Sequence, residues 1–129
     1  MTLIEPLSVA AGGAMGCLCR YALEFIPAIS TKPMPVIAAN LAGCLLIGIV
    51  SALLAHFNAS AVLNRLLVTG ILGGFTTFSA FALHPVMLIR QGLWAEAIGY
   101  VTLSVIGGLL LCAAAMTGTE YFLKTTSAL

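Results

Sequence analysis

The sequence carries very little charge. Five Lys+Arg and four Asp+Glu residues stand among 129, so charged residues make up 7% of the chain, against roughly 25% in soluble domains. A water-soluble globule needs a polar surface that this composition does not supply, and a disordered chain needs abundant charge. The net charge of +1 provides no basic field for nucleic acid. Soluble, disordered and nucleic-acid-binding proteins are therefore excluded.

The sequence also lacks the patterns typical of enzymes, cleaved signal peptides, disulfides and zinc sites. No carboxylate falls in the middle of an apolar segment, no Cys–His pair has a plausible spacing, and no glycine loop could cradle a phosphate, so we expect no enzyme. Glu5 but no Lys or Arg precedes the first apolar run, so we expect this run to be retained rather than cleaved as a signal peptide. All four cysteines lie in apolar runs, and we expect buried thiols rather than disulfides or zinc ligands: Cys17, Cys19, Cys44 and Cys112.

What the sequence has in abundance is apolar length. Hydrophobic residues make up 61% of the chain, and they gather in four segments at about residues 7–26, 35–56, 63–90 and 93–123. Each segment reaches the roughly 20 residues that cross a hydrocarbon core, and the connections between them are short. We predict an all-α integral membrane protein with a single unit over residues 1–129, four transmembrane helices, and both termini on one side of the bilayer.

Lysine and arginine are split almost evenly between the two sides of this arrangement. Arg65 and Lys124 fall on the side of the termini, and Lys32, Arg90 and Arg20 on or toward the other. A fixed orientation normally shows a clear cytoplasmic excess. We therefore expect the chain to insert both ways up and to form an antiparallel, dual-topology homodimer in the lipid bilayer.

Small residues recur at a spacing of four. In lipid, where helices gain no hydrophobic drive from meeting each other, such ridges let backbones pack closely. The sequence leaves open whether they pack within one chain or between subunits: Gly12 and Gly16, Ala39 and Gly43, Gly70 and Gly74.

The third segment contains a stretch that disfavours a continuous helix. Two glycines, Gly73 and Gly74, are closely followed by the β-branched Thr76 and Thr77. A break between about residues 73 and 78 would expose backbone groups at membrane depth, which is tolerated where they bind an ion or line a cavity. A simple kink is the alternative.

Neutral polar and aromatic side chains accompany this stretch. Phe78 and Phe81 share a face if the helix resumes, and their ring edges either pack or contact a desolvated anion. Asn40 either bridges helices or lines a pore. Tyr100 and Ser104 place two hydroxyls on one helical stripe. Because no Lys or Arg lies in the middle of a segment to trap an anion, this path favours a channel for a small anion.

Three motifs in order along the chain carry a family resemblance. They are Gly12-Gly13-Ala14-Met15-Gly16 with Arg20-Tyr21, Ala39-Asn40-Leu41-Ala42-Gly43, and Gly73-Gly74-Phe75-Thr76-Thr77-Phe78-Ser79. Together they resemble the Fluc (CrcB) family of fluoride channels over essentially the whole chain. The resemblance implies a dual-topology homodimer whose two antiparallel pores passively export fluoride from the cytoplasm across the cell inner (plasma) membrane.

The resemblance also implies roles for individual residues. Asn40, Phe78 and Phe81 match the family's pore asparagine and phenylalanines. Tyr100 and Ser104 match its tyrosine and serine on the fourth helix, where the motif is looser. These five residues are therefore expected to line the fluoride pore.

A second group of matches concerns a cation and the pore mouth. The family holds a structural sodium ion at the dimer centre on backbone carbonyls, and these carbonyls match Gly73 and Thr76. Arg20 matches the arginine near the aqueous mouth.

The chain departs from the family pattern at three positions after the break. Ala80 and Ala82 stand where hydroxyl residues are usual, and His84 stands where a glutamate is usual. We expect lower throughput, with His84 either a pH-dependent group at the mouth or a side chain that extends to the interface. A non-conducting or heteromeric subunit is one alternative. A small multidrug-type transporter is another, although it needs an acid in the first helix, and residues 10–19 contain none.

Overall fold

The computed structural model describes residues 3–31 and 33–127, and these residues form helices and connections without strands. The first helix, α1, spans Ile4–Ala22 and passes into a short 3-10 turn, η1, at Leu23–Phe25. The expectation of one helix over residues 7–26 is wrong at its end. Ile26 is extended because the residue before a proline is disfavoured in the helical conformation, and Pro27 follows.

The second helix, α2, spans Met34–His56. The next rod begins with α3 (Ala61–Asn64), continues as a π-helical stretch, η2 (Arg65–Leu72), and reaches α4 (Gly73–Phe75). The rod is then interrupted before it resumes.

Beyond the interruption, α5 runs over Phe78–Arg90. A tight turn leads to the last rod, formed by α6 (Trp94–Thr102), the π-helical η3 (Leu103–Gly107) and α7 (Gly108–Thr126). All four expected segments are thus helical, the third with an interruption.

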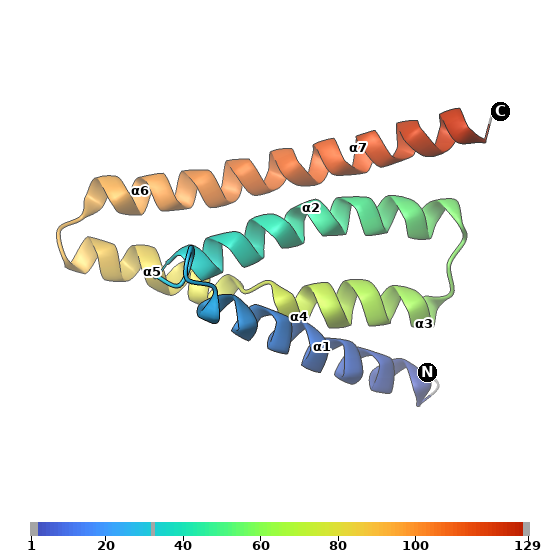
Figure 1. Ribbon diagram of the computed structural model, residues 1–129, viewed down its shortest axis with the longest axis horizontal. Helices are drawn as coiled ribbons and strands as arrows, with labels where there is room; N and C mark the ends of the chain where they lie inside the picture. Colours follow the sequence, from blue (N-terminus) through green and yellow to red (C-terminus); the bar gives the residue numbers. More distant parts are fainter. Residues whose placement is uncertain (1–2, 32, 128–129) are drawn as a thin grey trace.

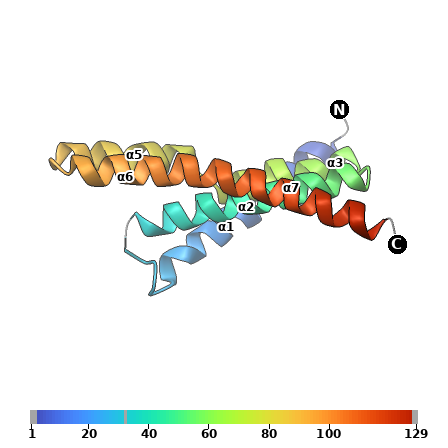
Figure 2. The same cartoon turned by 90° about the horizontal axis from the view of Figure 1, so that it is seen from above.

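The rods are arranged side by side (Figures 1 and 2). α1 lies along η2 and α4, α2 lies along α7, and α5 pairs with α6. The α5–α6 hairpin projects beyond the α1–α2 connection in both views. The start of α1 and the end of α7 lie at the same end of the molecule, as an even number of crossings requires.

Three helical rods in the described part of the chain are long and apolar enough to cross a membrane: Met34–His56, Ala61–Arg90 and Trp94–Thr126. The protein is therefore a multi-pass membrane protein. α1 is not among these three rods. It has 19 residues, and these include the charged side chains of Glu5 and Arg20. Of the cations in the charge comparison, Lys32 lies outside the described residues.

The glycine ridges pack within the chain. A Cβ added to Gly16 would overlap the carbonyl oxygen of Ile71, and one added to Gly12 would lie 2.5 Å from the carbonyl oxygen of Leu66. A Cβ on Gly74 would lie 2.6 Å from the carbonyl oxygen of Gly13. α1 therefore meets the third rod backbone against backbone, a distance that only glycine permits.

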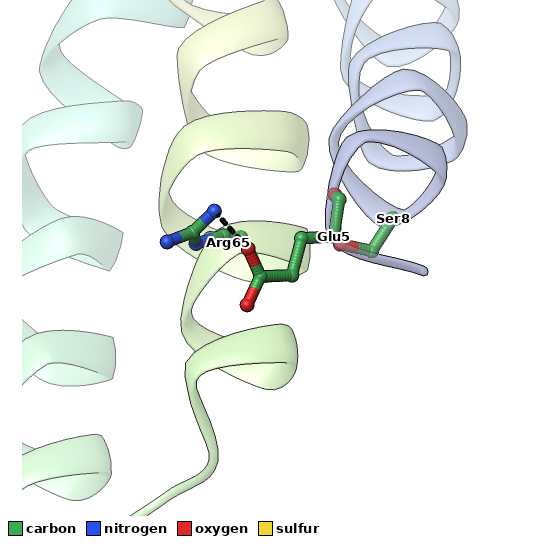
Figure 3. A network of polar contacts seen from close by, with 3 residues as sticks. All are labelled: Glu5, Ser8 and Arg65. Carbon is green, nitrogen blue, oxygen red and sulfur yellow. Dashed lines mark hydrogen bonds and ion pairs between the residues drawn. The ribbon is translucent and has the colours of Figure 1, made fainter. Parts of the chain in front are cut away.

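One ion pair joins the same two rods near the termini (Figure 3). Arg65 Nη1 lies 2.5 Å from Glu5 Oε2, and the Ser8 hydroxyl donates to the Glu5 backbone carbonyl at 2.7 Å. The Glu5 side chain is 17% exposed and that of Arg65 is 42% exposed. Solvent therefore screens the pair, which mainly fixes the position of α1 against η2.

Candidate ion-conducting site

The interruption of the third rod is a two-residue extended segment. α4 ends at Phe75, Thr76 has φ −84° and ψ 160°, and Thr77 has φ −150° and ψ 117°. The helix restarts at Phe78, where the Thr77 hydroxyl accepts a hydrogen bond from Ala80 N at 3.4 Å. The predicted break is present, and it is an interruption of the helix rather than a kink.

Asn40 on α2 holds the interruption through two hydrogen bonds. Its Nδ2 donates to the Thr77 carbonyl at 3.1 Å, and Thr77 N donates to its Oδ1 at 2.8 Å. A side-chain amide thereby replaces the helical partners of the N–H and the carbonyl group of one residue, Thr77. Asn40 bridges two rods and keeps a second amide hydrogen that neither of these two bonds uses.

The interruption also removes the usual donors from two carbonyls. In a continuous helix, Thr77 N would bond the carbonyl of Gly73, and Ala80 N would bond that of Thr76. Here Thr77 N bonds Asn40 and Ala80 N bonds the Thr77 hydroxyl. The carbonyls of Gly73 and Thr76 are thus left as neutral oxygen donors, the ligand type that hard cations prefer.

Four rings form a ladder from the interruption along α5. The ring centroids of Phe78 and Phe81 are 5.4 Å apart, and Phe81 stacks on Tyr100 of α6 at 5.6 Å and 20°. His84 follows, with its ring centroid 5.9 Å from that of Tyr100. The Phe78 side chain is 79% exposed, so one face of this ladder is uncovered in the single chain.

Two buried hydroxyls lack partners. Tyr100 Oη and Ser104 Oγ are shielded from solvent and have no hydrogen bond within the described residues. Ser104 lies in the π-helical stretch η3, a local geometry often found at functional sites. A buried hydroxyl without a partner costs free energy, so both groups are available to a ligand that accepts hydrogen bonds.

These features surround one partly open cavity of about 340 Å³. Its lining contains no Lys, Arg, His, Asp or Glu, so the walls are neutral. The predicted site residues among its lining are Asn40, Gly73, Thr76, Phe78, Phe81 and Ser104. Tyr100 is not among the lining residues, and it contacts the lining through the stack of its ring on Phe81.

Sequence reasoning missed part of the lining. Thr77 clasps Asn40 and caps α5, while Gly43 lies against the Thr76 methyl group. Threonine is a favoured N-cap residue, because its hydroxyl can accept a hydrogen bond from a backbone N–H group three residues later. This preference could have predicted the role of Thr77 from the sequence. Cys44 lines the cavity as well, and it is half-buried rather than enclosed.

The two residues assigned to the pore mouth do not line this cavity. In a continuous helix Arg20 would lie near Glu24, four residues later, but the two side chains do not form an ion pair. Arg20 Nη2 instead lies 3.8 Å from Cys17 Sγ. The reason is that α1 ends at Ala22 and the 3-10 turn changes the register. His84 Nδ1 lies 2.7 Å from the Ala80 carbonyl, so Nδ1 carries the hydrogen and Nε2 is free.

The expectation of four buried cysteines is also wrong. Cys17 and Cys19 are exposed, and Cys44 and Cys112 are half-buried. The glycine face of α1 makes the close contact with the third rod. The thiols of α1 lie beside this contact and stay exposed, although the Cys17 thiol still donates to the Gly74 carbonyl at 3.5 Å.

Comparison with known proteins identifies the family. Residues 7–116 match the family model described as CrcB-like protein, Camphor Resistance (CrcB). The "Fluoride-specific ion channel FluC" of Paracoccus denitrificans is 44% identical over 113 residues, covering 86% of this chain and 90% of the relative. The protein of that name from Rhizobium leguminosarum bv. trifolii is 45% identical over 123 residues, covering 90% and 94%.

A more distant relative agrees. The "Fluoride-specific ion channel FluC 2" of Listeria monocytogenes is 40% identical over 106 residues, covering 81% of this chain and 82% of the relative. These matches confirm the resemblance drawn from the three motifs, and the names of the relatives describe ion channels rather than enzymes. The chain belongs to the CrcB family.

Proposed function

We propose that this chain is a subunit of a fluoride-selective channel that passively exports fluoride from the cytoplasm. The observation that carries the proposal is the neutral cavity at the interruption, which is lined by Phe78, Phe81 and Ser104, whose hydroxyl lacks a partner. A small anion leaving water needs donors and electropositive ring edges. The absence of a fixed cation in the lining lets it leave again.

Reconstitution of the purified protein alone tests this function. Vesicles loaded with potassium fluoride should release fluoride on addition of a potassium ionophore, whereas vesicles loaded with potassium chloride should release far less chloride. Protein-free vesicles correct for leak of undissociated acid. Equal release of the two anions would refute selectivity. Fluoride release no faster than from protein-free vesicles would refute a self-sufficient channel and favour the heteromeric or non-conducting subunit.

A hydroxyl deletion tests whether the described cavity is the path. Ser104→Ala removes a buried, unpartnered donor, and a missing bond of about 1.4 kcal/mol corresponds to about tenfold slower flux. Ser30→Ala is the matched control, because Ser30 is exposed in the α1–α2 connection and bonds only the Pro27 carbonyl. Equal flux in the two variants would place the path elsewhere.

We propose an antiparallel homodimer as the functional unit, inserted in the cell inner (plasma) membrane with α1 as a fourth crossing. The outward face of α5 is apolar and uncovered in the single chain, with Phe78, Leu83 and Val86 all exposed. The near-equal distribution of Lys and Arg supports insertion both ways up. Each copy would provide one of two antiparallel pores.

Orientation is measurable with a single cysteine. In a variant whose four native cysteines are replaced by alanine, Asn58→Cys places one thiol in the α2–α3 connection. An impermeant thiol reagent added outside sealed vesicles should label about half of the chains, because a two-orientation population exposes each loop on both sides. Complete or negligible labelling would contradict dual topology.

We propose that the carbonyls of Gly73 and Thr76 hold a structural sodium ion at the dimer centre. Their chemistry fits, since both oxygens lack their helical donors, and a second copy would double the number of ligands. A bound sodium ion would add a positive charge beside the interruption. The dimer should therefore unfold at a higher temperature in sodium than in choline salts, and equal unfolding temperatures would contradict the site.

The alanines after the interruption should limit throughput. The hydroxyl oxygens of Thr77 and Ser79 are 3.2 Å apart. Ala80 and Ala82 follow them and have no hydroxyl, whereas the family pattern has hydroxyl residues at these two positions. Ala80→Thr combined with Ala82→Ser should increase fluoride flux. Unchanged flux would show that these positions do not limit conduction.

A further inference from the structure

Two cysteines lie across one helix–helix contact beside the cavity. α2 and α7 run side by side in the same direction (Figure 1). A Cβ built on Gly108 would lie 3.0 Å from Cys44 Sγ, and one built on Gly48 would lie 2.5 Å from the Cys112 carbonyl oxygen. Cys112 follows Gly108 by one helical turn, and Gly48 follows Cys44 by one turn.

This register brings the two thiols toward each other. Side chains on a helix lean toward its N-terminus, so the Cys112 side chain leans from its own level toward that of Gly108, against which the sulfur of Cys44 lies. The two groups are near enough for their charges to repel if both ionise. The contact glycines provide the room, because a side chain at position 48 or 108 would fill the space between the helices.

Access and chemistry favour a ligand rather than a cross-link. Both thiols are free and half-buried, and Cys44 forms part of the cavity wall together with Gly43 and Ile47. The cavity therefore gives an ion access to Cys44. Thiolates select soft cations such as monovalent copper and its analogues, whereas a hard cation prefers the oxygen atoms of the interruption.

We propose that Cys44 and Cys112 form a two-thiolate binding site for a soft monovalent cation. Each thiol releases one proton as its sulfur binds the metal, so no oxidant or reductant is needed. The bound ion lies at the contact between α2 and α7, beside the part of the cavity wall that α2 forms. If the cavity conducts, which rests on the function proposed above, binding also blocks fluoride flux.

The remaining cysteines offer a matched background. Cys17 and Cys19 are exposed on α1, and the Cys17 thiol donates to the Gly74 carbonyl of α4. Replacing both by alanine leaves the proposed pair as the only thiols. Silver is the probe, used in nitrate salts because silver chloride precipitates.

Metal content and affinity test the site without reference to conduction. The Cys17→Ala, Cys19→Ala protein in detergent should retain one silver ion per chain after desalting, measured by native mass spectrometry. Adding Cys44→Ala or Cys112→Ala should abolish this retention, since one of the two thiolate ligands is lost. Retention of the ion in either triple variant, or no retention in the background protein, would overturn the proposal. Gel filtration in detergent verifies that each variant is folded.

Flux and binding then separate the two hypotheses. In vesicles, silver should stop fluoride efflux through the background protein and leave the Cys112→Ala variant active, because Cys112 does not line the cavity. Silver binding in a protein that conducts no fluoride would support the thiolate site and refute the proposed function. Fluoride efflux with no retained silver would do the reverse.

Discussion

Replacing Asn40 by alanine should be among the most damaging single changes at the interruption. The variant leaves the Thr77 N–H and carbonyl without the partners that now lie at 2.8 and 3.1 Å. An unsatisfied buried group costs about 1–3 kcal/mol, so two groups cost about 2–6 kcal/mol in full isolation. Thr77 borders the cavity, where water can partly replace the lost bonds, so we expect the lower part of that range.

The assay combines unfolding with flux. Asn40→Ala should lower the free energy of unfolding in detergent by about 2–3 kcal/mol and lower fluoride efflux at least about tenfold, since the position of Thr77 sets where α5 restarts. Asn40→Asp separates the two roles of the amide. It keeps an acceptor for Thr77 N and loses the donor, and its negative charge repels an anion, so flux should fall more than stability.

Asn64→Ala provides the matched control. Asn64 is exposed at the end of α3, far along the rod from the interruption, and its replacement should change neither quantity. If Asn40→Ala matches Asn64→Ala and the parent in both unfolding and flux, the two hydrogen bonds do not hold the interruption, and the reasoning fails.

Two further predictions concern packing and charge. Gly16→Ala should destabilise the protein by about 1–3 kcal/mol, because the added Cβ overlaps backbone atoms of the third rod. Gly13→Ala is the control and should be neutral or stabilising, because the space around its Cβ is open. Equal free energies of unfolding in the two variants would contradict the backbone contact. Glu5→Gln should cost no more than about 0.5 kcal/mol, given the exposure of the ion pair, and a loss that persists in about 1 M salt would show an interaction other than charge.

The sequence alone was informative where the signal is local. Apolar length predicted a helical membrane protein, because crossing a hydrocarbon core requires long runs whose backbone groups bond internally. Gly73, Gly74, Thr76 and Thr77 predicted the interruption, since their helix preferences are poor and adjacent. The same stretch, together with two shorter motifs, was sufficient to indicate the family.

Tertiary structure decided whatever depends on partners distant in sequence. Asn40 and Thr77 are 37 residues apart, so the local sequence around either residue cannot reveal the bridge between them. The structure shows Asn40 bridging two rods and also lining the cavity. The glycine ridges were equally ambiguous. A spacing of four marks a face without naming its partner, and contact with Ile71 and Leu66 identifies it as the same chain.

Local periodicity also failed where the helix ended early or faced outward. Glu24 has the spacing to meet Arg20 only if α1 continues, and the turn before Pro27 ends it. Cys17 and Cys19 are apolar in context but exposed, because the glycine face of α1 makes the contact with the third rod. Composition determined that these residues belong in a membrane protein, whereas packing decided which of their faces is covered, since an apolar surface in lipid has no hydrophobic reason to turn inward.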